Sequence, residues 1–274
     1  ELIESTIELE AAEIKANRSR VQALNEMATI SARSFSVVET GRYAASAFDP
    51  ARMVQCYAGV TNAGDDFENE IIVRGNSPRG ILWRLEGIEI PNPNHFGELG
   101  GSGGSISMLS SSTMAPSDFY TGAFPAEFGN AMSGVFDIRL RNGNQEKREY
   151  SFMVGILGIE ASTEGYINKG SGASYLINYR YSTLDVLSLF YKPLGDIMPT
   201  YQDLSFKMNI PTKKLGTFAF FGLGGYNFYN ETGIADSLEW EDEWDNKSTF
   251  SSQLVTITGL SNLYHINNNT YLKT

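Results

Sequence analysis

The second half of the chain alternates hydrophobic and other residues with a period of two. Over residues 150–155 the sequence reads YSFMVG, and each large hydrophobic residue is followed by a residue that would face the opposite side of a strand. The same alternation recurs along the chain and predicts about seven strands. These are the strand that begins at Glu149 and residues 159–167, 174–181, 202–210, 217–229, 250–260 and 263–272.

The connections between these strands differ in length. Residues 168–172 and 211–214 are short turns, whereas residues 230–247 form a longer acidic loop. Alternating short and long connections, together with strands rich in Tyr and Phe, are typical of a transmembrane β-barrel. A water-soluble β-sandwich also alternates. The pattern alone therefore leaves both architectures open.

The first half of the chain predicts shorter elements. Asp49 and Pro50 supply a helix N-cap and a proline at the first helical position, and the apolar residues from Met53 to Val60 follow at helical spacing, with Gly59 near the end. Three strand-like segments follow at residues 71–74, 81–85 and 87–90. The turn sequences at 75–78 and 91–94 separate them. We expect a short helix and a small sheet.

Residues 122–141 form the junction between the two patterns. Pro125, Gly129 and Gly134 have the character of residues that allow unusual backbone conformations. Residues 135–139 alternate as a strand, and Asn142-Gly143 predicts a tight turn into the second half. Residues 142–147 are accordingly expected to be a cleavable boundary between two structural units.

Composition excludes several function classes. The 274 residues are 42% hydrophobic, which suffices for a packed core, and the net charge of −11 disfavours nucleic acid as a partner. Cys56 is the only cysteine, so the chain can form neither an internal disulfide nor a thiolate metal site. No apolar run reaches the length of a transmembrane helix. The start at Glu1, without methionine or an apolar signal segment, suggests a processed or excised piece of a longer chain.

Candidate chemistry is sparse. Glu86, Glu89, His95 and Glu98 could ligate a metal, but alternating strand positions do not guarantee that they converge, and only one histidine is present among them. The glycine-rich residues 100–104 lack the following Lys-Ser/Thr of a phosphate-binding loop. The two histidines of the chain lie outside the known catalytic motifs. We predict no enzyme activity, no metal and no cofactor.

Three motifs resemble a known family. They are Ile71-Ile72-Val73-Arg74-Gly75, the segment WRLEGIEIP at residues 83–91, and GAFPAEFG at residues 122–129 followed by SGVFDI at residues 133–138. In this order and at these separations they are similar to the plug motifs of TonB-dependent outer-membrane receptors, specifically the Bacteroidetes type.

The resemblance implies a fold and a division into domains. It implies an α+β plug domain with a small mixed sheet at residues 23–143, followed by residues 144–274 as antiparallel strands of an incomplete 22-stranded transmembrane β-barrel. Residues 1–22 would be an N-terminal lead-in, in which residues 7–14 resemble a degenerate TonB-contact segment.

The resemblance also implies a function, partners and a location. The function is TonB-dependent uptake of a scarce nutrient across the bacterial outer membrane, with the plug gating the barrel. The expected partners are periplasmic TonB, outer-membrane lipids, a small solute and, as in glycan-uptake relatives, a capping lipoprotein. A ligand-gated signalling receptor of the same architecture and a soluble β-rich binding protein are the alternatives.

Particular residues follow from the same resemblance. Arg74, Arg84 and Glu86 are candidates for a plug–barrel lock, because a charge buried between plug and barrel must be paired. The plug loops are expected to face the solute, through Asn76, Ser77, Arg79, Asn92, Asn94, His95 and Phe96.

Overall fold

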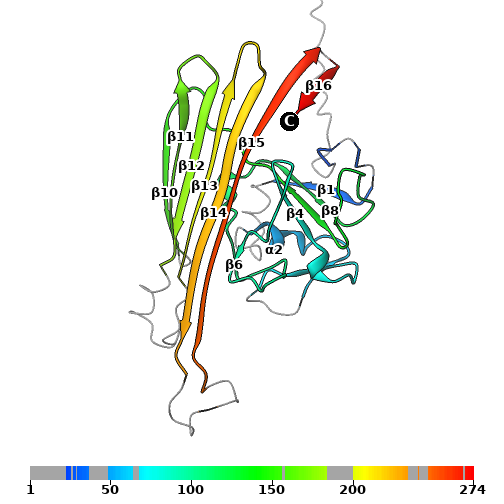
Figure 1. Cartoon of the computed structure of the whole chain (residues 1–274), viewed down its shortest axis with the longest axis vertical. Helices are drawn as coiled ribbons and strands as arrows, with labels where there is room; N and C mark the ends of the chain where they lie inside the picture. Colours follow the sequence, from blue (N-terminus) through cyan, green and yellow to red (C-terminus); the bar gives the residue numbers. More distant parts are fainter. Residues whose placement is uncertain are drawn as a thin grey trace, which may run out of the picture.

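A computed structural model gives the structure of the chain. It describes residues 23–25, 27–28, 30–36, 49–63, 68–155, 158–183, 200–233, 240, 246–267 and 269–274. The predicted lead-in at residues 1–22 and its TonB-contact segment lie outside the described residues. Figure 1 shows two parts side by side, a compact body built from the first half of the chain and a sheet of long strands from the second half. We call them the N-terminal body (residues 23–141) and the long sheet.

The N-terminal body is built around a five-stranded sheet in the order β1-β8-β9-β4-β5. Strands β4 and β9 are parallel and the other neighbours are antiparallel, so the sheet is mixed. The strands are β1 (Ala32–Phe35), β4 (Leu82–Leu85), β5 (Ile88–Ile90), β8 (Ser117–Tyr120) and β9 (Val135–Ile138). Two smaller pairs accompany it, β2 (Val60–Asn62) with β3 (Ile71–Val73), and β6 (Asn94–His95) with β7 (Ile106–Ser107).

Aromatic packing forms the core of this body. The rings of Trp83 and Phe136 stack with centroids 4.1 Å apart, and Phe119 packs against Phe136 at 4.5 Å. Trp83 belongs to β4 and Phe136 to β9, and the two residues lie directly opposite each other in these parallel strands. Trp83 also donates its indole N–H to the carbonyl oxygen of Ser102 at 2.9 Å, so the buried ring leaves no unpaired donor.

The predicted helix is shorter than its sequence pattern. Asp49 is the N-cap of α2 (Pro50–Val54), and its carboxylate accepts from the backbone N–H of Ala51 at 2.7 Å, as predicted. The helix ends at Val54, however, and Val60 belongs to β2. The extension to Val60 was therefore wrong, because Val60 is buried through strand pairing with Val73 and not through a helical face. Two 3₁₀ turns, η2 (Pro78–Gly80) and η3 (Ser111–Thr113), complete the body.

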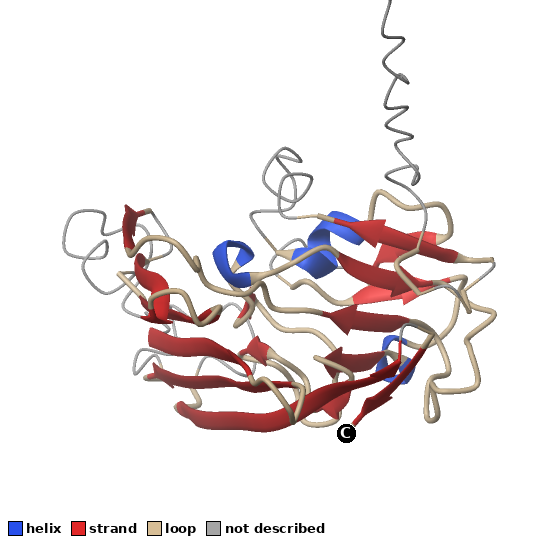
Figure 2. Cartoon of the chain, turned by 90° about the horizontal axis from the view of Figure 1, so that it is seen from above, coloured by secondary structure: helices blue, strands red, loops and turns tan. Residues whose placement is uncertain are grey.

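The long sheet is an antiparallel meander of seven strands, each paired with the next along the chain. Figure 2 shows it from above as a curved layer beside the N-terminal body. The strands are β10 (Glu149–Val154), β11 (Ile159–Asn168), β12 (Ala173–Tyr181), β13 (Thr200–Pro211), β14 (Thr217–Glu231), β15 (Thr249–Asn267) and β16 (Thr270–Lys273).

One predicted strand boundary in this sheet is wrong. The segments expected at 250–260 and 263–272 are separated by Ser261 and Asn262, but both residues pair with β14 and strand β15 continues through them. The chain turns later, where Asn267 accepts from the backbone N–H of Asn269 at 2.9 Å. Pairing with a long neighbour thus overrode a weak turn signal.

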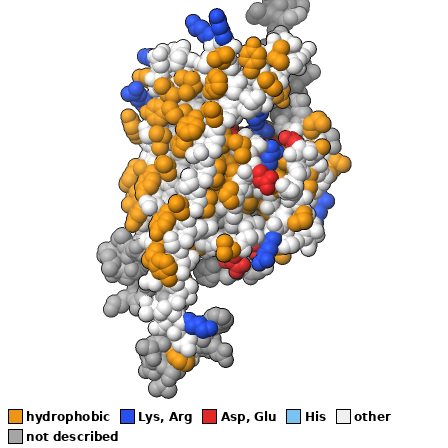
Figure 3. Space-filling view, viewed as in Figure 1, with side chains coloured by type: hydrophobic (Ala, Val, Ile, Leu, Met, Phe, Trp, Pro, Cys, Tyr) orange, Lys and Arg blue, Asp and Glu red, His pale blue; other side chains and the backbone are white. Residues whose placement is uncertain are grey.

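The two faces of the long sheet differ in chemistry. Tyr150, Phe152 and Val154 are exposed on one face of β10, and Ile177 and Tyr179 on the same face of β12. Figure 3 shows such hydrophobic side chains gathered over the strands. The opposite face carries buried polar residues against the N-terminal body, and on β14 the apolar residues Phe221 and Leu223, which join the core of the body. Among the described residues, no helix has the length and apolar character needed to cross a membrane.

The junction differs from its prediction. Asn142-Gly143 forms no tight turn, and Gly143 instead packs against the backbone of Tyr175, where a Cβ atom would collide with the carbonyl oxygen. Asn144 makes the bend, because its side-chain oxygen accepts from the backbone N–H groups of Glu146 at 2.9 Å and Lys147 at 3.1 Å.

Pro125, Gly129 and Gly134, which were predicted to allow unusual backbone conformations at the junction, have different surroundings. Gly129 has an ordinary backbone conformation and open space around it, so nothing there requires glycine. Gly134 allows close packing, since its Cβ would lie 3.2 Å from the carbonyl oxygen of Tyr120. Pro125 accepts from the backbone N–H of Phe128 at 3.0 Å and so opens a turn. Of the three, Gly134 is the position whose tight packing disfavours a side chain.

Candidate functional site

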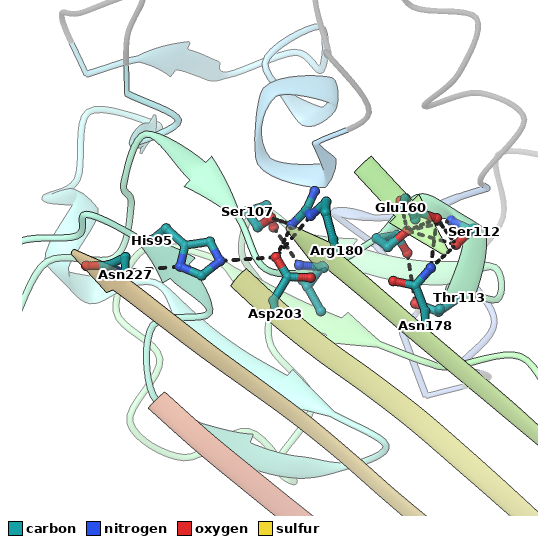
Figure 4. Close-up of polar contacts among 11 residues, drawn as sticks. His95, Ser107, Ser112, Thr113, Glu160, Asn178, Arg180, Asp203 and Asn227 are labelled. Carbon is teal, nitrogen blue, oxygen red and sulfur yellow. Dashed lines mark hydrogen bonds and ion pairs between the residues drawn. The ribbon is translucent and has the colours of Figure 1, made fainter. Parts of the chain in front are cut away.

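The candidate site is the contact between the N-terminal body and the inner face of the long sheet. Strand register places Glu160, Arg180, Asp203 and Gly225 opposite one another across the neighbouring strands β11 to β14. We call these four positions the cross-strand row. Residues that pair across strands share a face of the sheet. All four positions therefore lie on the face toward the body. Figure 4 shows the polar contacts that gather around it.

An ion pair with a histidine forms one half of the site. Arg180 donates from Nε and Nη2 to Oδ2 of Asp203, at 3.0 and 2.7 Å, and also to the carbonyl oxygen of Ser107 in the body. The ring nitrogen Nε2 of His95 lies 3.1 Å from the same carboxylate oxygen. Arg180 and Asp203 belong to the long sheet and His95 and Ser107 to the body, so this network joins the two parts.

The histidine contacts determine which ring nitrogen carries the proton. The amide nitrogen of Asn227 lies 3.4 Å from Nδ1 of His95, and the same amide donates to Gln253 at 2.9 Å. Since an amide nitrogen donates, Nδ1 accepts and the proton belongs on Nε2, which donates to Asp203. Burial lowers the pKa of His95 below its ordinary value, although the Asp203 carboxylate acts in the opposite direction. His95 is therefore neutral at neutral pH.

A second network surrounds the buried carboxylate of Glu160. Ser110, the N-cap of η3, donates to it at 3.1 Å, and Ser112, within η3, donates to it at 2.7 Å. Asn178, from the neighbouring strand β12, donates to the same carboxylate at 2.8 Å and to Ser112 at 3.1 Å. These neutral donors hold the serine turn of the body against the sheet.

Lys207 makes a third connection. Its ammonium group donates to Glu86 at 2.8 Å and to the carbonyl oxygen of Leu140 at 2.7 Å, and Glu86 in turn accepts from the backbone N–H of Leu140 at 2.6 Å. Both partners of the ion pair are largely buried. A strand of the long sheet thus holds together the β4–β5 turn and the end of β9.

A bidentate pair fixes the connection between the two parts. Arg141 donates to both carboxylate oxygens of Glu164, at 2.7 and 2.8 Å, and its Nε donates to the carbonyl oxygen of Ser112 at 2.6 Å. Two parallel hydrogen bonds of this kind are strong and geometrically specific. The chain therefore leaves the body along a defined path into β10.

Of the three lock candidates, Glu86 is the one whose described contacts reach the long sheet. Arg74 is exposed and donates to the hydroxyl groups of Ser31 at 2.9 Å and Thr121 at 3.3 Å, within the body. Arg84 also stays within the body, where it donates to the carbonyl oxygen of Gly87 at 2.7 Å and lies 3.6 Å from the carboxylate of Glu127.

The residues expected to face a solute divide into two groups. Asn76, Ser77 and Arg79 are exposed. Asn94 and His95 are fully buried, which argues against direct solute contact. Asn92 and Phe96 are half-buried. Asn94 belongs to a chain of amides in which Asn69 donates to it at 2.8 Å and to Asp49 at 2.6 Å, a structural role within the body.

The sequence prediction missed the residues of the long sheet that hold the body. Glu160, Asn178, Arg180, Asp203 and Lys207 were treated as ordinary polar positions of alternating strands. Their signal is a run of polar residues at every second position, which is present in β13 as Asp203, Ser205 and Lys207. Within the described part of the chain, no three His, Cys, Asp or Glu residues converge as a metal site would require.

Comparison with known proteins gives the fold. No protein-family model and no curated protein matches the sequence. The siderophore receptor PirA from Acinetobacter baumannii matches in structure, with 14% identity over 85% of this chain and a TM-score of 0.59. A double variant of the ferric enterobactin receptor PfeA from Pseudomonas aeruginosa matches with 12% identity over 85% of this chain and a TM-score of 0.55.

The chain spans 37% of the first receptor and 38% of the second. At these identities the likeness shows that the chain has the fold of part of such receptors. It does not bear on the Bacteroidetes type that the motifs indicate, and it leaves the strand number of a closed barrel as a prediction.

Loss of the Lys207 ammonium should destabilise the contact strongly. In Lys207→Met, Glu86 would remain largely buried without a cation, and breaking such a pair costs about 3–5 kcal/mol. Chemical unfolding of the detergent-solubilised protein measures the loss. Arg79→Met is the matched control, because the Arg79–Glu98 pair spans 3.9 Å between exposed side chains and contributes about 0–1 kcal/mol. Equal effects of the two substitutions would contradict this assignment.

Gly225 should tolerate no side chain. A Cβ atom there would lie 2.5 Å from Sδ of Met108 and 2.8 Å from Cε1 of His95, so Gly225→Val should destabilise the protein by about 1–3 kcal/mol or separate the body from the sheet. The neighbouring Gly224→Val is the control, since its Cβ would have no neighbour closer than 3.7 Å. Thermal unfolding distinguishes them, and a larger loss in Gly224→Val would refute the packing argument.

The contact should weaken in mild acid. The folded pKa of His95 lies below its ordinary value, so the unfolded state binds the proton more readily and stability falls as pH drops through about 6.5 and below. Unfolding measured between pH 7 and pH 5 should show a decline that His95→Gln reduces. His265→Gln, at the exposed histidine of β15, should retain the wild-type decline. A decline unchanged by His95→Gln would count against the prediction.

Proposed function

We propose that the chain is the plug and the first barrel strands of a TonB-dependent receptor that takes up a scarce nutrient across the bacterial outer membrane. One observation carries the proposal: the N-terminal body is held by buried polar contacts to one face of a curved antiparallel sheet whose other face is apolar. A lipid-facing exterior and a polar interior are the properties of an outer-membrane barrel wall.

The kinds of contact between the N-terminal body and the long sheet support a gating role. A wide barrel needs a plug to block passive flow, and the plug must be attached to the wall and yet be removable. In this chain the attachment combines polar networks around Asp203, Glu160 and Lys207 with apolar packing of β14 against the core of the body, through Phe221 and Leu223. The polar contacts are specific in geometry and can exchange with water when the plug is displaced.

The solute and TonB would act on opposite sides of the plug. The exposed loop around Asn76, Ser77 and Arg79 is the part of the proposed plug that a solute could contact. TonB would pull on the N-terminal segment from the periplasm. Arg74 and Arg84 are kept as lock candidates toward barrel strands outside this chain, and Glu86 toward Lys207 within it. The Bacteroidetes subtype and a capping lipoprotein rest on the sequence motifs alone.

The apolar exterior separates this proposal from a soluble binding protein. Phe152 is 69% exposed and Leu254 is 72% exposed, and both belong to an extended apolar face of the long sheet. Water-soluble proteins rarely expose large contiguous apolar surfaces. Lipid contact accounts for the surface without a further partner.

Uptake measurements test the proposed function. Cells that lack the gene should lose accumulation of one labelled solute from a panel of ferric siderophores, cobalamin, oligosaccharides and peptides, and cells that lack TonB should lose the same one. The receptor should remain in the outer-membrane fraction and require detergent for extraction. Accumulation that is independent of TonB, or recovery of the protein without detergent, would refute the proposal.

A further inference from the structure

On the inner face of the long sheet, Oγ of Ser174 and three further buried oxygen atoms have no hydrogen-bond partner among the described residues. The three lie close together in the strand pairing. They are Oδ1 of Asn178, Oδ1 of Asp203 and Oγ of Ser205. Each side chain is at most 2% exposed. A buried polar atom without a partner is costly, and such an atom in a native protein calls for a bound water or ion.

The three oxygens occupy neighbouring positions on one face. Asn178 lies directly opposite Ser205 in the pairing of β12 with β13, and Asp203 precedes Ser205 by two residues on the same side of β13. Directly paired side chains on a sheet have Cβ atoms only about 4.5–5.5 Å apart, and diagonal neighbours remain within reach. The oxygens still form no hydrogen bond with one another. This arrangement suits atoms that surround a shared ligand.

The orientation of two of these oxygens is set by their other contacts. The amide nitrogen of Asn178 donates to Glu160 and to Ser112, so a flipped amide would point its oxygen at a carboxylate. Oδ2 of Asp203 accepts from Arg180 and His95, which leaves Oδ1 as its free acceptor. Figure 4 shows Asp203 and Asn178 as members of two neighbouring groups of contacts. Both unpartnered oxygens are therefore fixed acceptors.

The charge around these oxygens is unbalanced among the described residues. Lys207 pairs with Glu86, and Arg141 pairs with Glu164. Arg180 forms an ion pair with Asp203 and interacts electrostatically with Glu160, which lies opposite it in the pairing of β11 with β12. The hydrogen-bond donors of the buried Glu160 carboxylate are neutral hydroxyl and amide groups. His95 adds no positive charge, because burial lowers its pKa below its ordinary value. The two carboxylates Asp203 and Glu160 thus share the single cation of Arg180, which leaves one excess negative charge among these groups.

We propose that Asn178, Asp203 and Ser205 bind a monovalent metal cation of the sodium or potassium class. Oxygen is the ligand type that hard cations select. One excess negative charge calls for a single positive charge, which a monovalent cation supplies and Ca²⁺ would exceed. A water molecule could bond to the oxygens but would leave the excess negative charge of Asp203 and Glu160 uncompensated. The inference does not depend on which solute the receptor carries.

The position gives the ion a defined effect. Asn178 holds Ser112 of the body, and Asp203 holds His95 of the body through its other oxygen. An ion between them would fix both side chains in the orientation that grips the body. The site would therefore strengthen the contact between the body and the long sheet.

Crystallography with a heavier analogue tests the site directly. Crystals of the detergent-purified protein soaked with Tl⁺ in place of Na⁺ should show an anomalous peak within bonding distance of the three oxygens. A water molecule at that place without anomalous signal would overturn the proposal. This result is independent of transport, so it would leave the proposed function intact.

Stability measurements with matched variants provide the second test. Replacing N-methylglucamine chloride by NaCl or KCl at the same ionic strength should raise the melting temperature by about 2–4 °C. Ser205→Ala should abolish the increase. Ser174→Ala should retain it, because Ser174 is another buried serine of β12 with an unpartnered hydroxyl, outside the proposed ligand set. An increase that survives in Ser205→Ala, or none in the unsubstituted protein, would refute the proposal.

Discussion

The fold depends on how charged groups are paired at a buried contact between two parts of one chain. Asp203 and Glu160 both lie out of water, where an unpaired carboxylate would be severely destabilising. Arg180 and His95 bind one carboxylate oxygen of Asp203, and Ser110, Ser112 and Asn178 donate to Glu160. Since the partners come from both the N-terminal body and the long sheet, neither part can satisfy its polar groups alone. The contact is therefore specific in position and register.

The two faces of the long sheet follow from the same constraint. A period of two places every second residue of β12 and β13 against the body, and those residues are mostly polar, with Leu176 as an apolar member, while the alternate ones are mostly large and apolar. In a water-soluble protein the apolar face of such a sheet is covered and the polar face is exposed. In the long sheet the apolar face is the exposed one. The reversal is the physical basis for interpreting the sheet as a piece of a membrane-spanning wall around a polar interior.

The sequence predicted the local structure better than the contacts between distant residues. Strands β10 to β14 lie within a few residues of their predicted bounds, because alternation is a local signal. The cap at Asp49 was confirmed for the same reason. The full burial of His95 could not be foreseen, since it depends on Asp203, 108 residues further along. The Glu86–Lys207 pair spans 121 residues, and nothing local in the sequence links the two.

A disulfide between the body and the long sheet tests the account most directly. Ser112→Cys with Asn178→Cys, in a Cys56→Ser background, joins two side chains that now share a hydrogen bond of 3.1 Å. The account predicts that the cysteines oxidise readily in the folded receptor and that the linked form fails to accumulate solute until a reductant restores uptake. Failure of the two cysteines to pair, or uptake by the fully linked receptor at the rate of the reduced one, would contradict it.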